Sequence, residues 1–332
     1  MAGIDEAIFR NLNNVRWNSF NKTCYNRTLD IYMQLTPEII IGSLIGLFTS
    51  FLWALSTNIY KSQSKEATPL AINALKMWGA MAFMSLIVIL PFRATPFNVP
   101  FENLIYLIAS VSIGLVVGDL VYLTSQERIG VSHAFPIANI YPILTYIVAI
   151  FLVNETIIIS RFIGIIVAVI GVTLISREQA KKNKREGIKQ FDVLGIGFAF
   201  LAALCWAFGT VLLQIGVTDI DPIDANFARM LFGGMIFVPI FIGSAKLGMH
   251  LPTRRATKIV IAAGFFGMTL GSLLYTYTVK FIGAPISALL GSTSPLFAVP
   301  ISVIFLKEKF NLRSILGASL TVIGVMLVIL AI

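Results

Sequence analysis

Long apolar stretches, separated by short polar segments, follow one another along most of the chain. A helix needs about 20 predominantly apolar residues to cross the hydrocarbon core of a bilayer. Because most connections are short, successive helices should run in opposite directions. The pattern therefore predicts an all-α integral membrane protein with ten transmembrane helices. The predicted spans are residues 38–60, 70–91, 104–125, 131–153, 159–176, 193–216, 223–245, 257–279, 283–306 and 311–331.

The composition excludes a soluble protein with a single core. Hydrophobic residues make up 57% of the 332 residues and charged residues only 12%, whereas soluble domains carry about 25% charged residues. The net charge is +9, but the basic residues lie in short segments between the apolar stretches. Such loop charges orient a membrane protein. We therefore expect membrane lipid around the chain, a multi-pass location in the cell membrane, and no nucleic-acid partner.

A polar tail and a basic linker divide the chain. Residues 1–37 form the tail and 38–179 the first block of five spans; residues 180–190 form the linker and 191–332 the second block. Two natural starts are compatible with this division, Met1 and Met33, because Met33 stands just before the first span.

The two blocks are an internal repeat, which appears when the first is aligned with the second at an offset of 153 residues. The matched positions include aromatic, amide, glycine and proline residues: Trp53 with Trp206, Asn73 with Asn226, Gly118 with Gly271, Tyr122 with Tyr275, Gly164 with Gly317, and Pro142 with Pro295. An odd number of spans per block places the second block upside down relative to the first. The sequence thus predicts two inverted five-helix repeats around a central cavity, an architecture used by many secondary transporters.

Three segments also carry a family resemblance: residues 50–57, 288–295 and 305–308. With these segments the chain, over 38–332, resembles the drug/metabolite transporter superfamily, and specifically its ten-span EamA-type permeases. The resemblance implies transport of metabolites or amino acids, most commonly export. It also implies that both termini lie inside the cell. The loop charges disagree, because most Lys and Arg lie in the loops on the other face, and the positive-inside rule then places both termini outside.

Two charged residues inside the first repeat predict an ion pair. A charge at mid-membrane costs roughly 3 kcal/mol or more, so it normally faces protein or water. Lys76 lies near the start of the second span and Asp119 near the end of the third, which places them at similar depth. We expect them to approach closely. Two roles are open for Asp119: a static partner of Lys76, or a carboxylate that couples transport to protons.

Arg229 stands where the first repeat has Lys76, but Ser272 stands where the first has Asp119. We hypothesise that Arg229 faces the cavity and attracts a carboxylate or another anionic group through its planar, fork-like guanidinium. The alternative is that Arg229 extends to the membrane interface or to Asp224, because long basic side chains do so readily.

Further cavity residues are predicted from polar and aromatic positions inside spans. Pro142 and Pro295 are expected to kink the fourth and ninth helices, because proline removes a backbone hydrogen bond. The polar residues before them would then line the cavity, and simple helix packing is the alternative for every aromatic residue. The complete predicted substrate-cavity set is Trp53, Asn73, Lys76, Asp119, Tyr122, Asn139, Trp206, Asn226, Arg229, Tyr275, Ser292 and Ser294.

The sequence favours a transporter over an enzyme. It contains only two histidines and no metalloprotease, nucleophile-elbow or phosphate-loop motif, so we expect no catalysis, cofactor or metal. The predicted function is a secondary transporter that moves a small polar metabolite by alternating access. The partners expected are this small-molecule substrate and protons as a coupling ion; the sequence gives no oligomeric state. The alternative is a non-transporting membrane protein, such as a lipid-binding or regulatory scaffold.

Overall fold

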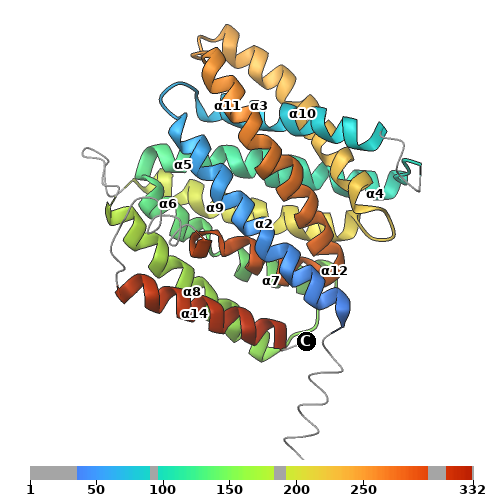
Figure 1. The fold of residues 1–332 in the computed structure, drawn as a ribbon, viewed down its shortest axis with the longest axis vertical. Coiled ribbons are helices and arrows are strands. Elements are labelled where there is room, and N and C mark those ends of the chain that lie inside the picture. The colour runs from blue at the N-terminus through green and yellow to red at the C-terminus, as the bar shows by residue number, and fades with distance from the viewer. Residues whose placement is uncertain (1–35, 90–95, 183–191, 298–311, 331–332) are drawn as a thin grey trace, which may run out of the picture.

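The structure is a computed structural model that describes residues 36–89, 96–182, 192–297 and 312–330. Within these ranges all regular elements are helices, as predicted (Figure 1). The predicted tail, most of the linker and the second part of the ninth span lie outside the described residues.

The helices follow the predicted spans closely. The first repeat contains α2 (Pro37–Ser62), α3 (Pro69–Ile89), α4 (Phe101–Ser110), η1 (Val111–Gly118), α5 (Asp119–Ile129), α6 (Val131–Ala138), α7 (Tyr141–Leu152) and α8 (Ile159–Lys182). The second contains α9 (Val193–Gly216), α10 (Pro222–Lys246), α11 (Arg254–Gly264), η2 (Phe265–Leu270), α12 (Gly271–Ser292) and α14 (Leu312–Leu330). Among the described residues, eight helical stretches are long and apolar enough to cross a membrane, and Ile315–Leu330 is a shorter apolar helix. The all-α membrane fold is confirmed, while the number ten is not established.

One of these eight stretches, Arg254–Ser292, is 39 residues long, about twice what a single crossing requires. It is divided at Gly283, whose backbone is not helical (φ 77°, ψ 168°). Gly130 has nearly the same backbone angles (φ 74°, ψ 156°) and separates α5 from α6. These two glycines are equivalent in the repeat, and only glycine adopts such angles without strain. The same turn therefore joins the third to the fourth span and the eighth to the ninth.

The repeat extends to a rare backbone feature. η1 and η2 are π-helical segments, and they occupy equivalent positions at the 153-residue offset. Such segments are uncommon and often occur at functional sites. η1 leads directly into α5, which begins at Asp119. η2 leads into α12, which has Ser272 at the equivalent position.

The inverted relation between the repeats is visible where α8 packs against α14, side by side in Figure 1. A Cβ added to Gly171 would lie 2.5 Å from the carbonyl oxygen of Gly317, and one added to Gly164 would lie 2.9 Å from that of Gly324. Exchanging the repeats turns the first contact into the second, as a two-fold axis requires. The small residues let the two backbones approach closely.

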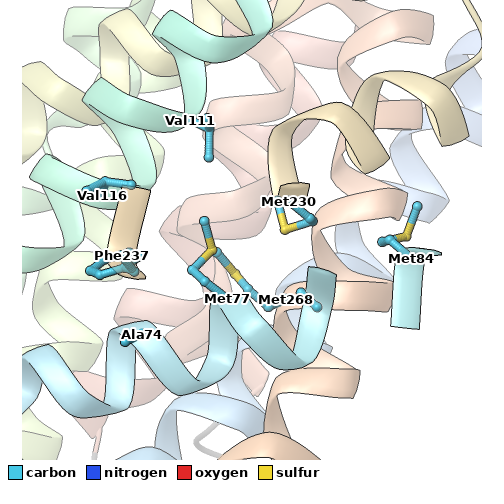
Figure 2. Close-up of a cluster of buried hydrophobic side chains, with 9 residues drawn as sticks. Ala74, Met77, Met84, Val111, Val116, Met230, Phe237 and Met268 are labelled. Carbon is cyan, nitrogen blue, oxygen red and sulfur yellow. The ribbon is translucent and has the colours of Figure 1, made fainter. Parts of the chain in front are cut away.

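The repeats are interleaved rather than separate blocks. α3 of the first repeat packs against α10, α11 and η2 of the second. Reciprocally, α9 packs against α4, η1 and α5 of the first. An apolar cluster of side chains from α3, η1, α10 and η2, shown in Figure 2, lies where the repeats meet and includes Met77, Met230 and Met268. Met77 and Met230 are equivalent in the repeat, so each repeat contributes the same residue type to the cluster.

The interruption predicted from Pro142 is confirmed, and it lies on the N-terminal side of the proline. The fourth span breaks at Asn139 and Ile140, between α6 and α7, and Pro142 lies in the first turn of α7. A helix start tolerates proline because its missing N–H would have no partner there. In the second repeat α12 ends at Ser292, again before the proline, Pro295.

Candidate functional site

The predicted approach of Lys76 to Asp119 is confirmed. The Lys76 Nζ atom lies 2.5 Å from Asp119 Oδ2, and Lys76 is only 8% exposed. The other carboxylate oxygen, Oδ1, accepts a hydrogen bond of 2.9 Å from the indole N–H of Trp206. Asp119 therefore binds Lys76 of its own repeat through one oxygen and Trp206 of the second repeat through the other. Both of its oxygens have partners.

The predicted aromatic residues form two equivalent pairs. The ring centroid of Trp206 is 4.8 Å from that of Tyr122, and Trp53 is 5.0 Å from Tyr275. The glycines of the third and eighth spans make room for them, because a Cβ on Gly118 would lie 3.0 Å from Trp206 and one on Gly271 2.9 Å from Trp53. Each tryptophan comes from the opposite repeat to its tyrosine. The layer of aromatic rings therefore joins the two repeats.

The indole groups of the two tryptophans differ in their partners. Trp206 donates to the carboxylate of Asp119, whereas Trp53 donates to the backbone oxygen of Gly267 at 3.0 Å. The difference follows from the sequence, because the second repeat has Ser272 in place of the acid. The aromatic frame is thus symmetric and its charges are not.

Arg229, at the position equivalent to Lys76, is also buried, with 4% exposed. Its Nη1 donates to the hydroxyl of Thr276 at 3.5 Å, and no ion pair of Arg229 is found within the described ranges. The structure does not support the alternative that Arg229 extends to Asp224 or to the membrane interface, because its side chain is buried against α12. Asp224 Oδ2 accepts a hydrogen bond from the backbone N–H of Asn98 at 3.2 Å.

The two equivalent asparagines are fully buried beside these bases. Asn73 Nδ2 donates to the backbone oxygen of Leu115 at 3.4 Å. Asn226 Oδ1 accepts from the hydroxyl of Ser272 at 2.8 Å. They bring α3 against η1 and α10 against α12, so they also position the bases that follow them by one turn.

The predicted cavity role of Asn139, Ser292 and Ser294 stays a prediction. No hydrogen bond or ring contact among the described residues connects them to Lys76, Asp119 or Arg229. Ser292 donates to Leu289 O of its own helix, at 2.7 Å. Asn139 is buried at the break between α6 and α7.

Sequence reasoning missed three residues that the structure places at the site. Tyr60 lies with its ring centroid 5.9 Å from Lys76 Nζ. Tyr141 packs its ring 5.7 Å from Trp206 and donates to Ala288 O at 2.7 Å. Thr276 is the partner of Arg229. The sequence signal for Tyr141 was its place in the polar run that begins at Asn139, and the signal for Thr276 was its place next to Tyr275. Tyr60 gave no such signal, because it resembles an interfacial tyrosine at a helix end.

The polar side chains of this layer are of several chemical kinds. No group of three or more His, Cys, Asp or Glu side chains suited to a metal ion occurs in the part of the chain that the structure describes. The layer instead offers hydroxyl, amide, indole and guanidinium groups between aromatic rings. A membrane protein core that buries so many polar groups normally uses them for a substrate or an ion pathway.

Comparisons with known proteins give the family. The sequence model of the EamA-like transporter family matches residues 40–177 and again 193–330, one match for each repeat. An uncharacterized transporter of Archaeoglobus fulgidus is 23% identical over 288 residues, which cover 86% of this chain and 97% of that protein. The WAT1-related protein At3g02690 of Arabidopsis thaliana is 26% identical over 56% of this chain and 45% of that protein. A solved crystal structure matches with a TM-score of 0.70 at 16% identity, covering 86% of this chain and 95% of that chain. The chain therefore belongs to the EamA-like transporter family.

Proposed function

We propose that this membrane protein is a secondary transporter that moves a small polar metabolite, an amino acid or a molecule of similar size, out of the cell. The observation that carries the proposal is the hydrogen bond between Trp206 and Asp119, whose other oxygen bonds Lys76. A charged pair in the core of a membrane protein is costly, and such pairs normally mark a substrate or ion pathway.

The polar layer is formed by Lys76, Asp119, Arg229, the two asparagines beside them and the four aromatic residues. Its position between the repeats supports a substrate site. Inverted repeats place such a site near mid-membrane, where equivalent helices of the two repeats meet. The ring pairs Trp53–Tyr275 and Trp206–Tyr122 connect the repeats at this level. We therefore assign the substrate site to Lys76, Asp119, Arg229, the two asparagines beside them and the four aromatic residues.

Interleaving of the repeats determines which helices would move. Each repeat is packed into the other, so the two repeats cannot separate as rigid halves. We infer that one moving body combines α2, α3, α11 and η2, and that the other combines α9, α10, α4 and η1. Their contact is the methionine-rich cluster of Figure 2. Methionine side chains adapt to changes in packing, which suits a contact that must rearrange.

For Asp119, the geometry supports the static role over proton coupling. Both of its oxygens are occupied, by Lys76 and Trp206. A proton-carrying carboxylate would have to release one of these partners in each cycle. An Asp119→Asn variant that transports with the same pH dependence as the parent protein would support the static role, and loss of that dependence would support coupling.

A transport screen tests the proposal. Cells with and without the protein are exposed to amino acids, sugars, nucleosides and cationic drugs, and compounds that differ in accumulation are then tested in proteoliposomes. We expect at least one small polar compound to move in the presence of the protein. Arg254→Gln, at the exposed start of α11, provides a matched loss of charge outside the site and should leave transport unchanged. A well-folded protein that moves none of these compounds would favour the non-transporting scaffold.

A further inference from the structure

Two of the buried bases, Lys76 and Arg229, occupy equivalent positions in the repeats but have different surroundings. Lys76 binds Asp119, whereas the partner of Arg229 is the uncharged hydroxyl of Thr276. Within the described residues, the first repeat thus has a neutralised base and the second has a base with no counter-ion. Because the aromatic frame around them is symmetric, the difference lies in the charges and not in the fold.

Two buried hydrogen-bond donors of the second repeat lack acceptors among the described residues. Arg229 Nε and Asn226 Nδ2 are buried and have no acceptor among the described residues. The oxygen of Asn226 is already used, because it accepts from Ser272. The hydroxyl of Thr276 donates to the backbone oxygen of Ser272 at 2.9 Å. What this group of side chains lacks is an acceptor, preferably a negatively charged one.

The donors of Asn226 and Arg229 both lie where α10 packs against α12. Asn226 and Arg229 are three residues apart on α10 and therefore lie on one face. Their partners Ser272 and Thr276 are one turn apart on α12. The two donors are thus neighbours along a single α10–α12 contact. Tyr275, next to Thr276, stacks with Trp53 at 5.0 Å, so an aromatic pair adjoins the donors.

We propose that Arg229 and Asn226 form an oxyanion subsite, which binds the carboxylate or phosphate group of the transported molecule. This inference rests on the proposed transport function and narrows its substrate to molecules with an acidic group. The guanidinium offers two parallel N–H groups, which match the two oxygens of such a group, and the amide of Asn226 supplies a third donor. The bound oxyanion takes the place that Asp119 occupies beside Lys76.

The burial of Arg229 also favours the binding of an anionic group. A buried charge without a partner destabilises a protein, and removal of that penalty by a ligand favours binding. In the conformation described, the side chain is enclosed, so the oxyanion enters when the helices around α10 and α12 open. Without a ligand, the positive charge of Arg229 is uncompensated. A bound oxyanion neutralises it.

A binding experiment on the purified, full-length protein tests the subsite independently of transport. Fluorescence of the tryptophans and the thermal unfolding midpoint are followed with acetate, succinate, inorganic phosphate and a phosphate monoester, each compared with its neutral amide or alcohol and with cationic amines. We expect stabilisation by at least one class of oxyanion, and at least ten-fold weaker binding of the neutral counterparts. The carboxylate and phosphate arms then identify which oxyanion fits.

Variants decide whether Arg229 is responsible. Arg229→Gln should weaken oxyanion binding at least ten-fold, while Arg254→Gln should not change it. Ser272→Asp supplies in the second repeat the acid that the first repeat has in Asp119. This variant should raise the unfolding midpoint without ligand and abolish oxyanion binding, so a loss of binding cannot be attributed to poor folding.

The outcomes separate this inference from the function on which it rests. If oxyanions bind equally to the parent protein, Arg229→Gln and Ser272→Asp, the subsite is wrong. If neutral or cationic compounds bind and are transported while no oxyanion does, the subsite is wrong and the transporter stands. If no compound of any class binds or is transported by folded protein, both proposals are overturned.

Discussion

Trp206 of the second repeat donates its indole N–H to Asp119 of the first, at 2.9 Å, while Lys76 binds the other oxygen of the same carboxylate. The two oxygens of this partly buried acid thus have one partner from each repeat. The contact joins the repeats at the level of the aromatic rings, where the charges of the protein core are concentrated.

Removal of the negative charge alone should destabilise the protein. Asp119→Asn keeps an oxygen for Trp206 but leaves Lys76 without its counter-ion. We expect a loss of about 3–5 kcal/mol, as is typical when one partner of a buried pair is removed. Combining it with Lys76→Met should restore much of this loss, because the pair is then replaced by uncharged groups. Unfolding in detergent measures both variants, and additive losses would contradict the assignment of a coupled pair.

Close helix packing at α8 and α14 gives a second prediction. Gly171→Ala places a methyl group 2.5 Å from the Gly317 carbonyl oxygen and from the Thr321 backbone nitrogen, and a backbone cannot move aside cheaply. Overpacking of this kind costs about 1–3 kcal/mol. Gly197→Ala in α9 is the matched control, because no atom lies within 4 Å of the added methyl group. Equal unfolding midpoints for the two variants would exclude the close approach.

The turn glycines give a third prediction. Gly130→Ala and Gly283→Ala force a side chain into a backbone conformation with φ of 74° and 77°, which costs of the order of 1–3 kcal/mol. Gly243→Ala, in a helix and with open space around its Cβ, should not destabilise. Thermal unfolding of the three variants tests this. Because the turns are equivalent, the two turn variants should lose similar stability, and a difference of more than about 2 kcal/mol would contradict that equivalence.

Acid should weaken one contact at the start of α9. Asp192 caps this helix and binds Arg128 Nε at 2.6 Å, and this hydrogen bond is the main cause that holds the pKa of Asp192 below its ordinary value of 3.8. A carboxyl with a lowered folded pKa contributes stability above its ordinary pKa and loses it as pH falls through the folded value. Asp192→Asn keeps the capping oxygen but not the charge.

The pH dependence of unfolding separates these two roles of Asp192. The midpoint difference between the parent protein and Asp192→Asn should be constant near neutral pH and shrink below about pH 4. It should also decrease in high salt, because the pair is exposed to solvent. A difference that stays the same down to pH 2 would show that Arg128 does not stabilise the folded protein through the ionised carboxylate.

The fold could be predicted from the sequence because its rules are local. Apolar length predicted the helices, and the repeated Gly118 and Gly271 indicated close helix packing. That the packed groups are Trp206 and Trp53 appears only in the structure. The Lys76–Asp119 pair followed from depth and charge alone. The break at Asn139 and Ile140 follows from Pro142, because proline has no N–H to bond the residue four positions earlier, so the interruption falls on its N-terminal side.

The surroundings of the site could not be predicted in the same way. Contacts between helices depend on rotation about each helix axis, which a single sequence does not determine. For this reason the partner of Arg229, Thr276, and the ring of Tyr60 beside Lys76 appear only in three dimensions. Interleaving of the repeats was missed for a related reason, since alignment of two segments shows their likeness but not which helices pack together.

Orientation in the membrane is the subject of a further prediction. The positive-inside rule places both termini outside, opposite to the expectation from the family resemblance. On the loop charges we predict that a reporter fused to the C-terminus is extracytoplasmic. A cytoplasmic signal from such a fusion would show that the family orientation overrides the loop charges in this chain.

Alternating exposure of the polar layer is the central claim, and cysteine labelling tests it most directly. Thr276→Cys is placed in a background with Cys24→Ser and Cys205→Ala and reconstituted in oriented vesicles, with Phe151→Cys, at the exposed end of α7, as the control. The account predicts that a membrane-impermeant thiol reagent reaches Cys at position 276 from either side of the membrane, and the control position from one side only. Labelling of position 276 from a single side, or from neither, would contradict the account.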